Sequence, residues 1–120
     1  MGKRAVAPLA VVAVALATVS VAAAGNTLLK ISAQKTALKY NVTKLNATAG
    51  KVTISMANPS AIFKHDVAIK GNGVNKKGAT VGKGGTSKVV VTLKPGKYTF
   101  YCTVPGHEAA GMKATLTVTK

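Results

Sequence analysis

The sequence predicts an all-β domain, a sandwich or barrel of seven to eight short strands. After residue 24, apolar residues recur at every second position, as in Val52, Ile54 and Met56, which is the period of a half-buried strand. Turn-forming residues separate these stretches, and no stretch of this region carries a helical apolar stripe. The chain has 120 residues, enough for one such domain and too few for two.

The first 24 residues differ from the rest in composition. Residues 1–4 are basic, residues 5–21 are almost entirely alanine, valine and leucine, and residues 22–24 are alanines. This pattern is typical of an export signal, so we predict a signal peptide over 1–24 and a mature domain over 25–120. The alternative is an uncleaved membrane anchor, because the apolar run approaches the roughly 20 residues that span a bilayer. The protein is expected in the periplasm, outside the cell or on the cell surface.

The strands follow one another along the mature chain. Alternation predicts strands over 52–56, 89–93 and 114–118, and a further strand on which Tyr98, Phe100 and Cys102 share one face. His65 has the parity of Val67 and Ile69 at the start of another strand. The glycine- and lysine-rich region 71–88 is expected to be a long surface excursion. Turn signals lie at Ala49-Gly50, Asn58-Pro59-Ser60, Gly71-Asn72-Gly73, Gly82 to Gly85 and Lys94-Pro95-Gly96-Lys97.

The mature domain is strongly basic. Residues 25–120 contain fifteen lysines and no arginine against Asp66 and Glu108, a net charge of +13. Such a charge favours an acidic partner protein or an anionic envelope polymer or membrane surface; the alternative is a solubilising surface with no particular partner. Nucleic acid is not expected as a partner, because export is predicted and residues 25–120 have no arginine for phosphate and guanine contacts.

The stretch FYCTVPGHEAAGM, residues 100–112, contains the only cysteine of the chain. A lone cysteine in an exported chain is a free thiol, an intermolecular link or a metal ligand. Strand parity points Cys102 inward at the end of one strand and Met112 inward at the start of the next, with His107 between them.

His65 is the remaining histidine and can supply a fourth ligand. Each of these residues alone is more often part of a core, but their order, spacing and parity together favour a metal site. Two histidines, a thiolate and a distant thioether form the ligand set of a blue-copper site, and zinc is the alternative metal.

The segments KHDVAIK and YTFYCTVPGHEAAGM resemble the cupredoxins, small type 1 copper proteins such as plastocyanin, azurin and auracyanin. The resemblance implies a Greek-key β-sandwich that holds one type 1 copper ion. It assigns His65, Cys102 and His107 as strong ligands and Met112 as the weak axial ligand. It also implies that electrons enter and leave through the exposed edge of His107, inside an apolar patch of Pro105, Gly106, Ala109, Ala110, Ala61 and Ile62.

The resemblance implies a one-electron carrier and not an enzyme, since no histidine remains to hold a second, catalytic copper. The expected partners are redox proteins with an acidic docking surface, and the carrier is expected to be a monomer. Membrane association through an uncleaved N-terminal segment or an anionic surface stays open. Two other functions stay open, namely a copper-handling protein that stores or delivers the metal and a metal-free surface binding module.

Two residues beside the ligands depart from the plastocyanin pattern. Lys64 precedes His65 where plastocyanin has a proline, and the second departure is Asp66. Many such chains have asparagine after the first histidine, with a side chain that ties the two ligand loops together, and this chain has Asp66. An ionised aspartate only accepts hydrogen bonds, so the hydroxyl and N–H of Thr103 are the expected donors. The alternative is a solvated aspartate.

Overall fold

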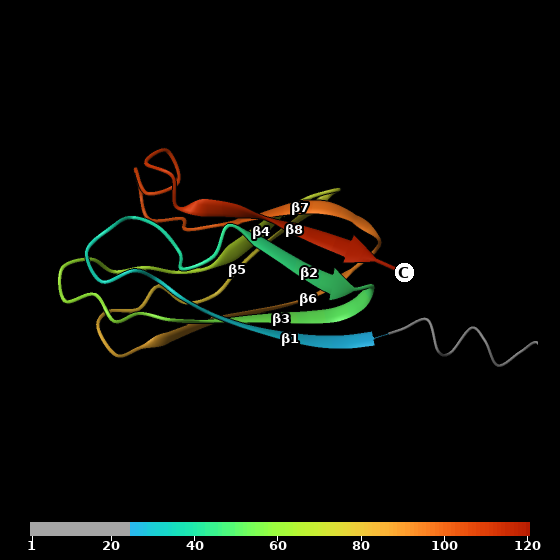
Figure 1. Ribbon diagram of the computed structural model, residues 1–120, viewed down its shortest axis with the longest axis horizontal. Coiled ribbons are helices and arrows are strands. Elements are labelled where there is room, and N and C mark those ends of the chain that lie inside the picture. The colour runs from blue at the N-terminus through green and yellow to red at the C-terminus, as the bar shows by residue number, and fades with distance from the viewer. Residues whose placement is uncertain (1–24) are drawn as a thin grey trace, which may run out of the picture.

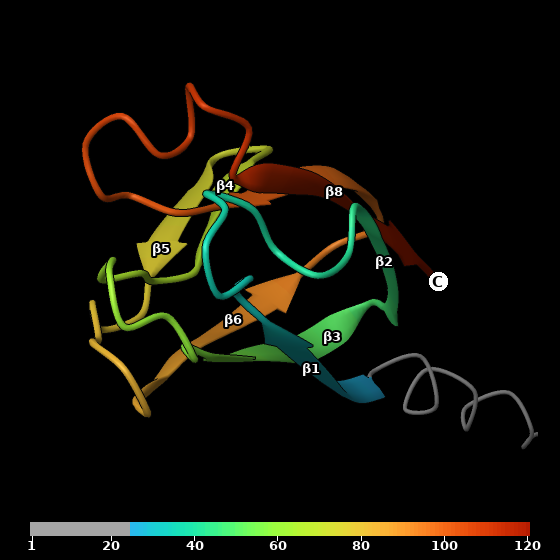
Figure 2. The same ribbon diagram turned by 60° about the vertical axis from the view of Figure 1, so that its left-hand side comes forward.

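The structure is a computed structural model that describes residues 25–120, so the signal peptide predicted over 1–24 lies outside the described residues. Two β-sheets pack against each other as opposed layers (Figures 1 and 2). One sheet has the order β1-β3-β6 and the other β2-β8-β7-β4-β5. The predicted all-β sandwich of seven to eight strands is therefore confirmed. The strands are β1 (Gly25–Ser32), β2 (Lys44–Thr48), β3 (Gly50–Ala57), β4 (Ala68–Gly71), β5 (Val74–Lys77), β6 (Thr86–Leu93), β7 (Gly96–Tyr101) and β8 (Lys113–Thr119).

Strands that are distant in sequence lie side by side, as a Greek-key order requires. Strand β1 pairs in parallel with β3, and β2 pairs in parallel with β8, whereas the other neighbouring strands are antiparallel. The chain changes sheet at each of its first three connections, from β1 to β2, from β2 to β3 and from β3 to β4. None of these long-range pairings follows from alternation alone. Among residues 25–120, no helix is long and apolar enough to cross a membrane.

The alternation in the sequence marks the faces that meet in the core. Val52, Ile54 and Met56 on β3 are completely buried, as the period-two pattern predicts. Ile69, Phe100 and Leu116 on the opposite sheet are completely buried as well. The sandwich interior therefore combines one face from each sheet, which gives the ligand-bearing loops a rigid base.

The region 71–88 lies mostly at the surface, but the prediction of a long excursion is wrong in one respect, because the region contains a strand and the start of another. Strand β5 forms a hairpin with β4, and β6 begins at Thr86. Asn72 and Gly73 connect β4 to β5 with φ angles of 48° and 82°, the pair of left-handed conformations that a type I′ turn needs. The pattern failed here because β5 is an edge strand whose residues are mostly exposed, so it has no apolar alternation to reveal it.

The loops that carry the predicted ligands lie at one end of the sandwich. The connection from β3 to β4 and the connection from β7 to β8 reach the same end, and residue 25 and the C-terminus lie at the other (Figure 1). Cys102 follows β7 directly and Met112 precedes β8 directly, one residue outside each strand. The strand ends thus hold both residues close to the core.

Candidate metal centre

Three of the four predicted ligands come together in one buried cluster. One ligand atom from each of His65, Cys102 and His107 lies within 4.8 Å of the other two. The Cys102 Sγ lies 4.0 Å from His65 Nδ1 and 3.6 Å from His107 Nδ1. Two imidazole nitrogens therefore face one sulfur from opposite loops.

The backbone of the β7–β8 loop places Cys102, His107 and Met112 relative to one another. The Cys102 N–H donates to the Met112 carbonyl at 3.1 Å, and the Met112 N–H donates to the His107 carbonyl at 3.0 Å. Gly106 and Gly111 adopt φ angles of 86° and 113°, which only glycine adopts easily, so they allow the tight reversals of this loop. Met112 is completely buried, and these two bonds hold its backbone next to Cys102 and His107.

His65 is held by a separate network from the β3–β4 loop. Its N–H donates to the Val81 carbonyl at 3.0 Å, and its carbonyl accepts from the Val81 N–H at 2.8 Å. The buried Asn58 side chain donates to the carbonyls of Phe63 and Val81 at 3.0 and 2.8 Å. The sequence indicated only a turn at Asn58. In the fold its two hydrogen bonds also hold the segment that carries His65.

Aromatic packing encloses the two imidazoles. The Phe63 ring lies 6.0 Å from the His65 ring and 5.7 Å from the His107 ring between centroids, the second pair edge-to-face. His65 and Cys102 are 0% and 1% exposed, and His107 is 7% exposed. Phe63 was missed by sequence reasoning, because an isolated phenylalanine before a histidine has no distinguishing pattern.

The cluster fits a trigonally coordinated metal. In a trigonal plane with ligand distances of about 2.0 Å to nitrogen and about 2.3 Å to sulfur, each nitrogen lies about 3.7 Å from the sulfur. The observed separations of 3.6 and 4.0 Å bracket this value. Both nitrogens that face the sulfur are Nδ1, so the two rings approach in the same way. Both separations from the sulfur are thus compatible with such a plane.

The protonation state of His65 suits a metal ligand, whereas Cys102 must lose a proton to become one. Burial, and secondarily the neighbouring His107, lower the pKa of His65, which keeps its imidazole neutral, as a ligand must be. Burial raises the pKa of the Cys102 thiol. The metal-free protein therefore holds the cysteine proton at neutral pH, and a metal must displace it when it binds.

Asp66 ties the ligand loops together, and the predicted contact with Thr103 is confirmed. The Thr103 N–H donates to Asp66 Oδ1 at 2.7 Å, and the Thr103 hydroxyl donates to Oδ2 at 2.5 Å. The Thr80 hydroxyl donates to Oδ2 at 2.8 Å, a contact that the sequence did not indicate. Burial raises the pKa of this carboxyl, but the donors outweigh burial and hold the pKa below its ordinary value.

A second tie reaches the ligand loop from β4. Lys70 Nζ lies 2.6 Å from Glu108 Oε2 and 4.3 Å from the centre of the Tyr101 ring. Glu108 follows His107 directly, so this ion pair connects the β7–β8 loop to the neighbouring strand. Both side chains are partly exposed, and such pairs contribute little to stability.

Comparisons with known proteins agree with this geometry. The family model described as copper binding proteins, plastocyanin/azurin family, matches residues 27–119. Reduced auracyanin from Roseiflexus castenholzii is 26% identical, with 81% of this chain and 99% of that chain covered and a TM-score of 0.70. A structure of auracyanin B is also 26% identical, with 78% and 89% covered and a TM-score of 0.70.

More distant structures share the fold. Rusticyanin from Thiobacillus ferrooxidans is 18% identical, with 79% of each chain covered and a TM-score of 0.63. A search of curated protein sequences finds no match. The family match covers most of the chain and nearly all of its described residues. The chain therefore belongs to the plastocyanin/azurin family of copper binding proteins, with copper as its cofactor.

Proposed function

We propose that this protein is an exported one-electron carrier whose mature domain, residues 25–120, holds one type 1 copper ion. His65, Cys102 and His107 would bind the metal in a plane, and Met112 would be the weak axial ligand. The observation that carries this proposal is the buried cluster in which two Nδ1 atoms face one Sγ, in a chain of a copper-binding family. Copper in such a site alternates between Cu(I) and Cu(II).

The residues around the cluster keep its geometry constant, which a fast electron carrier requires. The Cys102 Sγ accepts a hydrogen bond from the Asp66 N–H at 3.4 Å. The Asp66 carboxylate joins the segments that carry His65 and Cys102, and Val81 pins the backbone of His65. A site held from several loops changes little when the charge of the metal changes, so little reorganisation opposes electron transfer.

Burial of the ligands supports a carrier over a protein that stores or delivers copper. A delivery site needs ligands that an acceptor can reach, whereas His65, Cys102 and Met112 are at most 1% exposed. No further histidine is present for a catalytic copper, which supports a carrier over an enzyme.

His107 is the most exposed of the four proposed ligands and the best route for electrons. Its 7% exposure compares with 0–1% for the others. Pro105, Gly106, Ala109 and Ala110 are exposed around it, and Ile62 is 67% exposed on the loop that leads to Phe63. Lys35 and Lys83 border the hollow at Ile62. An apolar contact area with a lysine rim suits brief docking of an acidic redox protein.

An absorption spectrum after addition of Cu(II) to the mature domain tests the proposed function. A thiolate in a trigonal copper site gives an intense blue charge-transfer band. The band should appear with one equivalent of copper and disappear on reduction by dithionite. A colourless complex, or binding of zinc with the exclusion of copper, would contradict the proposal.

Met112→Leu is expected to keep the copper and the blue band and to raise the reduction potential. A weak axial thioether donates electron density that favours Cu(II), so its loss favours Cu(I). Voltammetry of the purified variant measures the change. Met56→Leu is the matched control, because Met56 is equally buried, lies on β3 and should leave the potential unchanged. Complete loss of copper from Met112→Leu would show that Met112 has another role.

Salt is expected to change the rate of electron transfer with small redox reagents according to their charge. Oxidation of the reduced protein by anionic hexacyanoferrate should slow as salt rises, because the Debye length falls from about 30 Å at 0.01 M to about 8 Å at 0.15 M. A cationic cobalt complex is the control and should react faster at high salt. Stopped-flow mixing measures both rates. Equal behaviour of the two reagents would show that the +13 charge does not act at the electron-transfer surface.

A further inference from the structure

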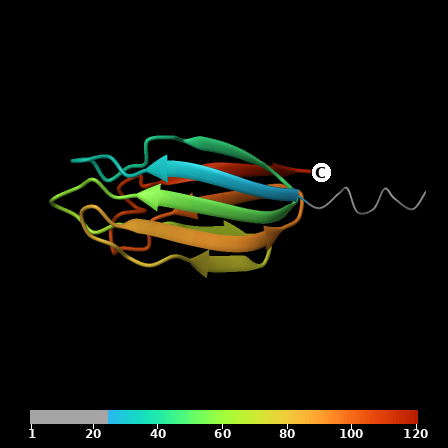
Figure 3. The ribbon, with the colours of Figure 1, turned by 90° about the horizontal axis from the view of Figure 1, so that it is seen from below.

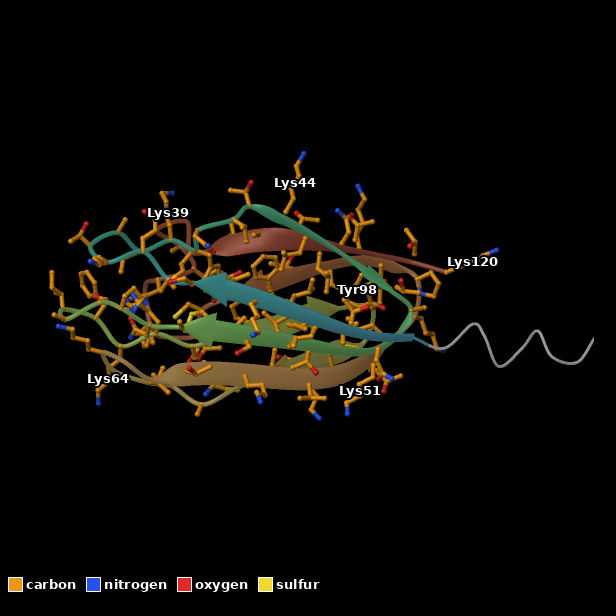
Figure 4. All side chains as sticks on the ribbon, turned by 60° about the horizontal axis from the view of Figure 1, so that its bottom comes forward. Lys39, Lys44, Lys51, Lys64, Tyr98 and Lys120 are labelled. Carbon is orange, nitrogen blue, oxygen red and sulfur yellow. The ribbon has the colours of Figure 1, made fainter. Side chains whose placement is uncertain are left out.

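The outer face of the β1-β3-β6 sheet has a regular arrangement of apolar and basic residues. The strand register places Leu28, Thr53 and Val90 in one row across the three strands. On the same side of the sheet, Lys51 lies in the next row toward the start of β3. Lys30 and Lys88 lie in the next row toward its end. Figure 3 shows the three strands side by side, and Figure 4 shows Lys51 pointing away from the sandwich. We call these six residues the β1-β3-β6 face.

This face exposes apolar surface that the described chain does not cover. Leu28 is 58% exposed and Val90 is 40% exposed. Among residues 25–120, the other large apolar side chain that is exposed to this degree is Ile62, which lies at the ligand end. The exposed apolar residues of the face are therefore separate from the contact area around His107.

The face contains no negative charge. Asp66 is buried beneath the ligand loops, and Glu108 is paired with Lys70 on the opposite sheet. A second copy of the chain would place lysines against lysines if it docked here through the same face, so self-association is disfavoured. The partner of this face must be anionic and must accept apolar side chains.

We propose that the β1-β3-β6 face binds the surface of an anionic phospholipid bilayer. Lysines on both sides of an apolar row can reach lipid phosphates while Leu28 and Val90 enter the boundary between headgroups and acyl chains. This inference rests on the proposed export. The apolar residues 5–24 directly precede β1, so export through this segment would deliver β1 first at the membrane surface. The position of β1 after the apolar segment, the lysines of the face and its exposed apolar side chains are thus all consistent with a bilayer surface.

Binding through this face would leave the metal centre free. The strands run from the end with residue 25 to the end with the ligand loops, so a sheet that lies flat on a bilayer directs the ligand end along the membrane plane (Figures 1 and 3). His107 and its apolar surroundings would then face proteins on the same membrane. The carrier could exchange electrons with them by lateral movement.

Flotation of residues 25–120 with vesicles tests this proposal, because this segment contains all eight strands and the described core. The wild-type domain should bind vesicles of phosphatidylcholine mixed with phosphatidylglycerol and should not bind phosphatidylcholine alone. The triple variant Lys30→Gln, Lys51→Gln, Lys88→Gln should bind about a hundredfold more weakly, at roughly fivefold for each lysine near an anionic surface. Leu28→Ser with Val90→Thr should weaken binding about tenfold.

A matched triple variant separates this face from the overall charge. Lys44→Gln, Lys97→Gln and Lys113→Gln remove the same charge from exposed positions on the opposite sheet. That sheet lies about 10 Å further from the bilayer, beyond the Debye length at physiological salt, so binding should fall less than about threefold. Equal losses in the two triple variants would overturn the proposal. A loss from the lysine changes with none from Leu28→Ser and Val90→Thr would also overturn it, because the domain would then adsorb by charge alone without inserting its apolar row.

Discussion

Cys102→Ser is expected to abolish the blue absorption band and the redox couple of the copper-loaded protein. The band requires a thiolate bound to Cu(II), and a serine hydroxyl is not ionised at neutral pH and is a harder donor. Cys102 is 1% exposed and its Sγ lies 3.6 and 4.0 Å from the two histidine nitrogens. It is the only cysteine of the chain, and the thioether of Met112 cannot form a thiolate, so no other side chain replaces this donor. Absorption spectroscopy and voltammetry after addition of copper measure the result.

The same variant is expected to remain folded without metal. Serine differs from cysteine by one atom, and the hydrogen bond from the Cys102 backbone to Met112 does not depend on the side chain. Circular dichroism and thermal melting of the two metal-free proteins provide the control. A folded Cys102→Ser protein that is still blue would refute the ligand assignment, and an unfolded one would show that Cys102 is first a core residue. Metal-free Cys102→Ala is a further control, because alanine has no polar atom. If Cys102→Ala folds and Cys102→Ser does not, the buried hydroxyl of serine causes the loss.

Asp66→Ala is expected to cause the largest loss of stability among single changes around the cluster. It leaves the Thr103 N–H and the hydroxyls of Thr103 and Thr80 without their acceptor, the buried Asp66 carboxylate. Thr103 is half-buried and Thr80 is exposed. Hydrogen bonds to a charged group contribute about 1.5–3 kcal/mol each, partly offset here because the exposed Thr80 hydroxyl can turn to water, so the free energy of unfolding should fall by about 3 kcal/mol. For a domain of this size the melting temperature should fall by about 15 °C. Melting of the metal-free protein measures this change.

Glu108→Ala is the matched control, because it removes the other carboxylate of the chain and the same charge. Its partner Lys70 is 42% exposed in its side chain and can turn to solvent, so the free energy of unfolding should change by less than about 1 kcal/mol. Asp66→Asn keeps one acceptor oxygen and should fall between the two alanine variants. Equal melting temperatures for Asp66→Ala and Glu108→Ala would show that net charge, and not the hydrogen-bond network, determines stability here.

The two carboxylates show how far local sequence can indicate a role. Both are single acidic residues next to a proposed histidine ligand, and nothing in their immediate neighbours distinguishes them. Asp66 is completely buried with three hydrogen bonds to its side chain, and Glu108 forms one partly exposed ion pair. The resemblance to plastocyanin-like chains indicated Thr103 as a partner of Asp66. Thr80 could not be predicted as a partner of Asp66, because threonines are common in polar stretches such as this one. Its distance from Asp66 depends on the path of the β5–β6 connection.

The sequence alone determined the strands that have one face in the core and the other toward solvent. It also determined the residues that begin and end the ligand loop. Burial of one face imposes a period of two on β3, β6, β7 and β8, so their inward residues could be read directly. Cys102, His107 and Met112 lie within eleven residues, and short loops bring such neighbours together in most arrangements of the flanking strands.

Only the tertiary structure decided which distant segments meet. The parallel pairing of β1 with β3, the edge strand β5, and the approach of Asn58, Phe63 and Thr80 to the centre all join residues across separate loops. The outer rows that form the β1-β3-β6 face depend on the register of three strands, which no single strand contains. The physical reason is that periodicity reports whether a side chain is buried, whereas its partner is chosen by packing of the whole chain.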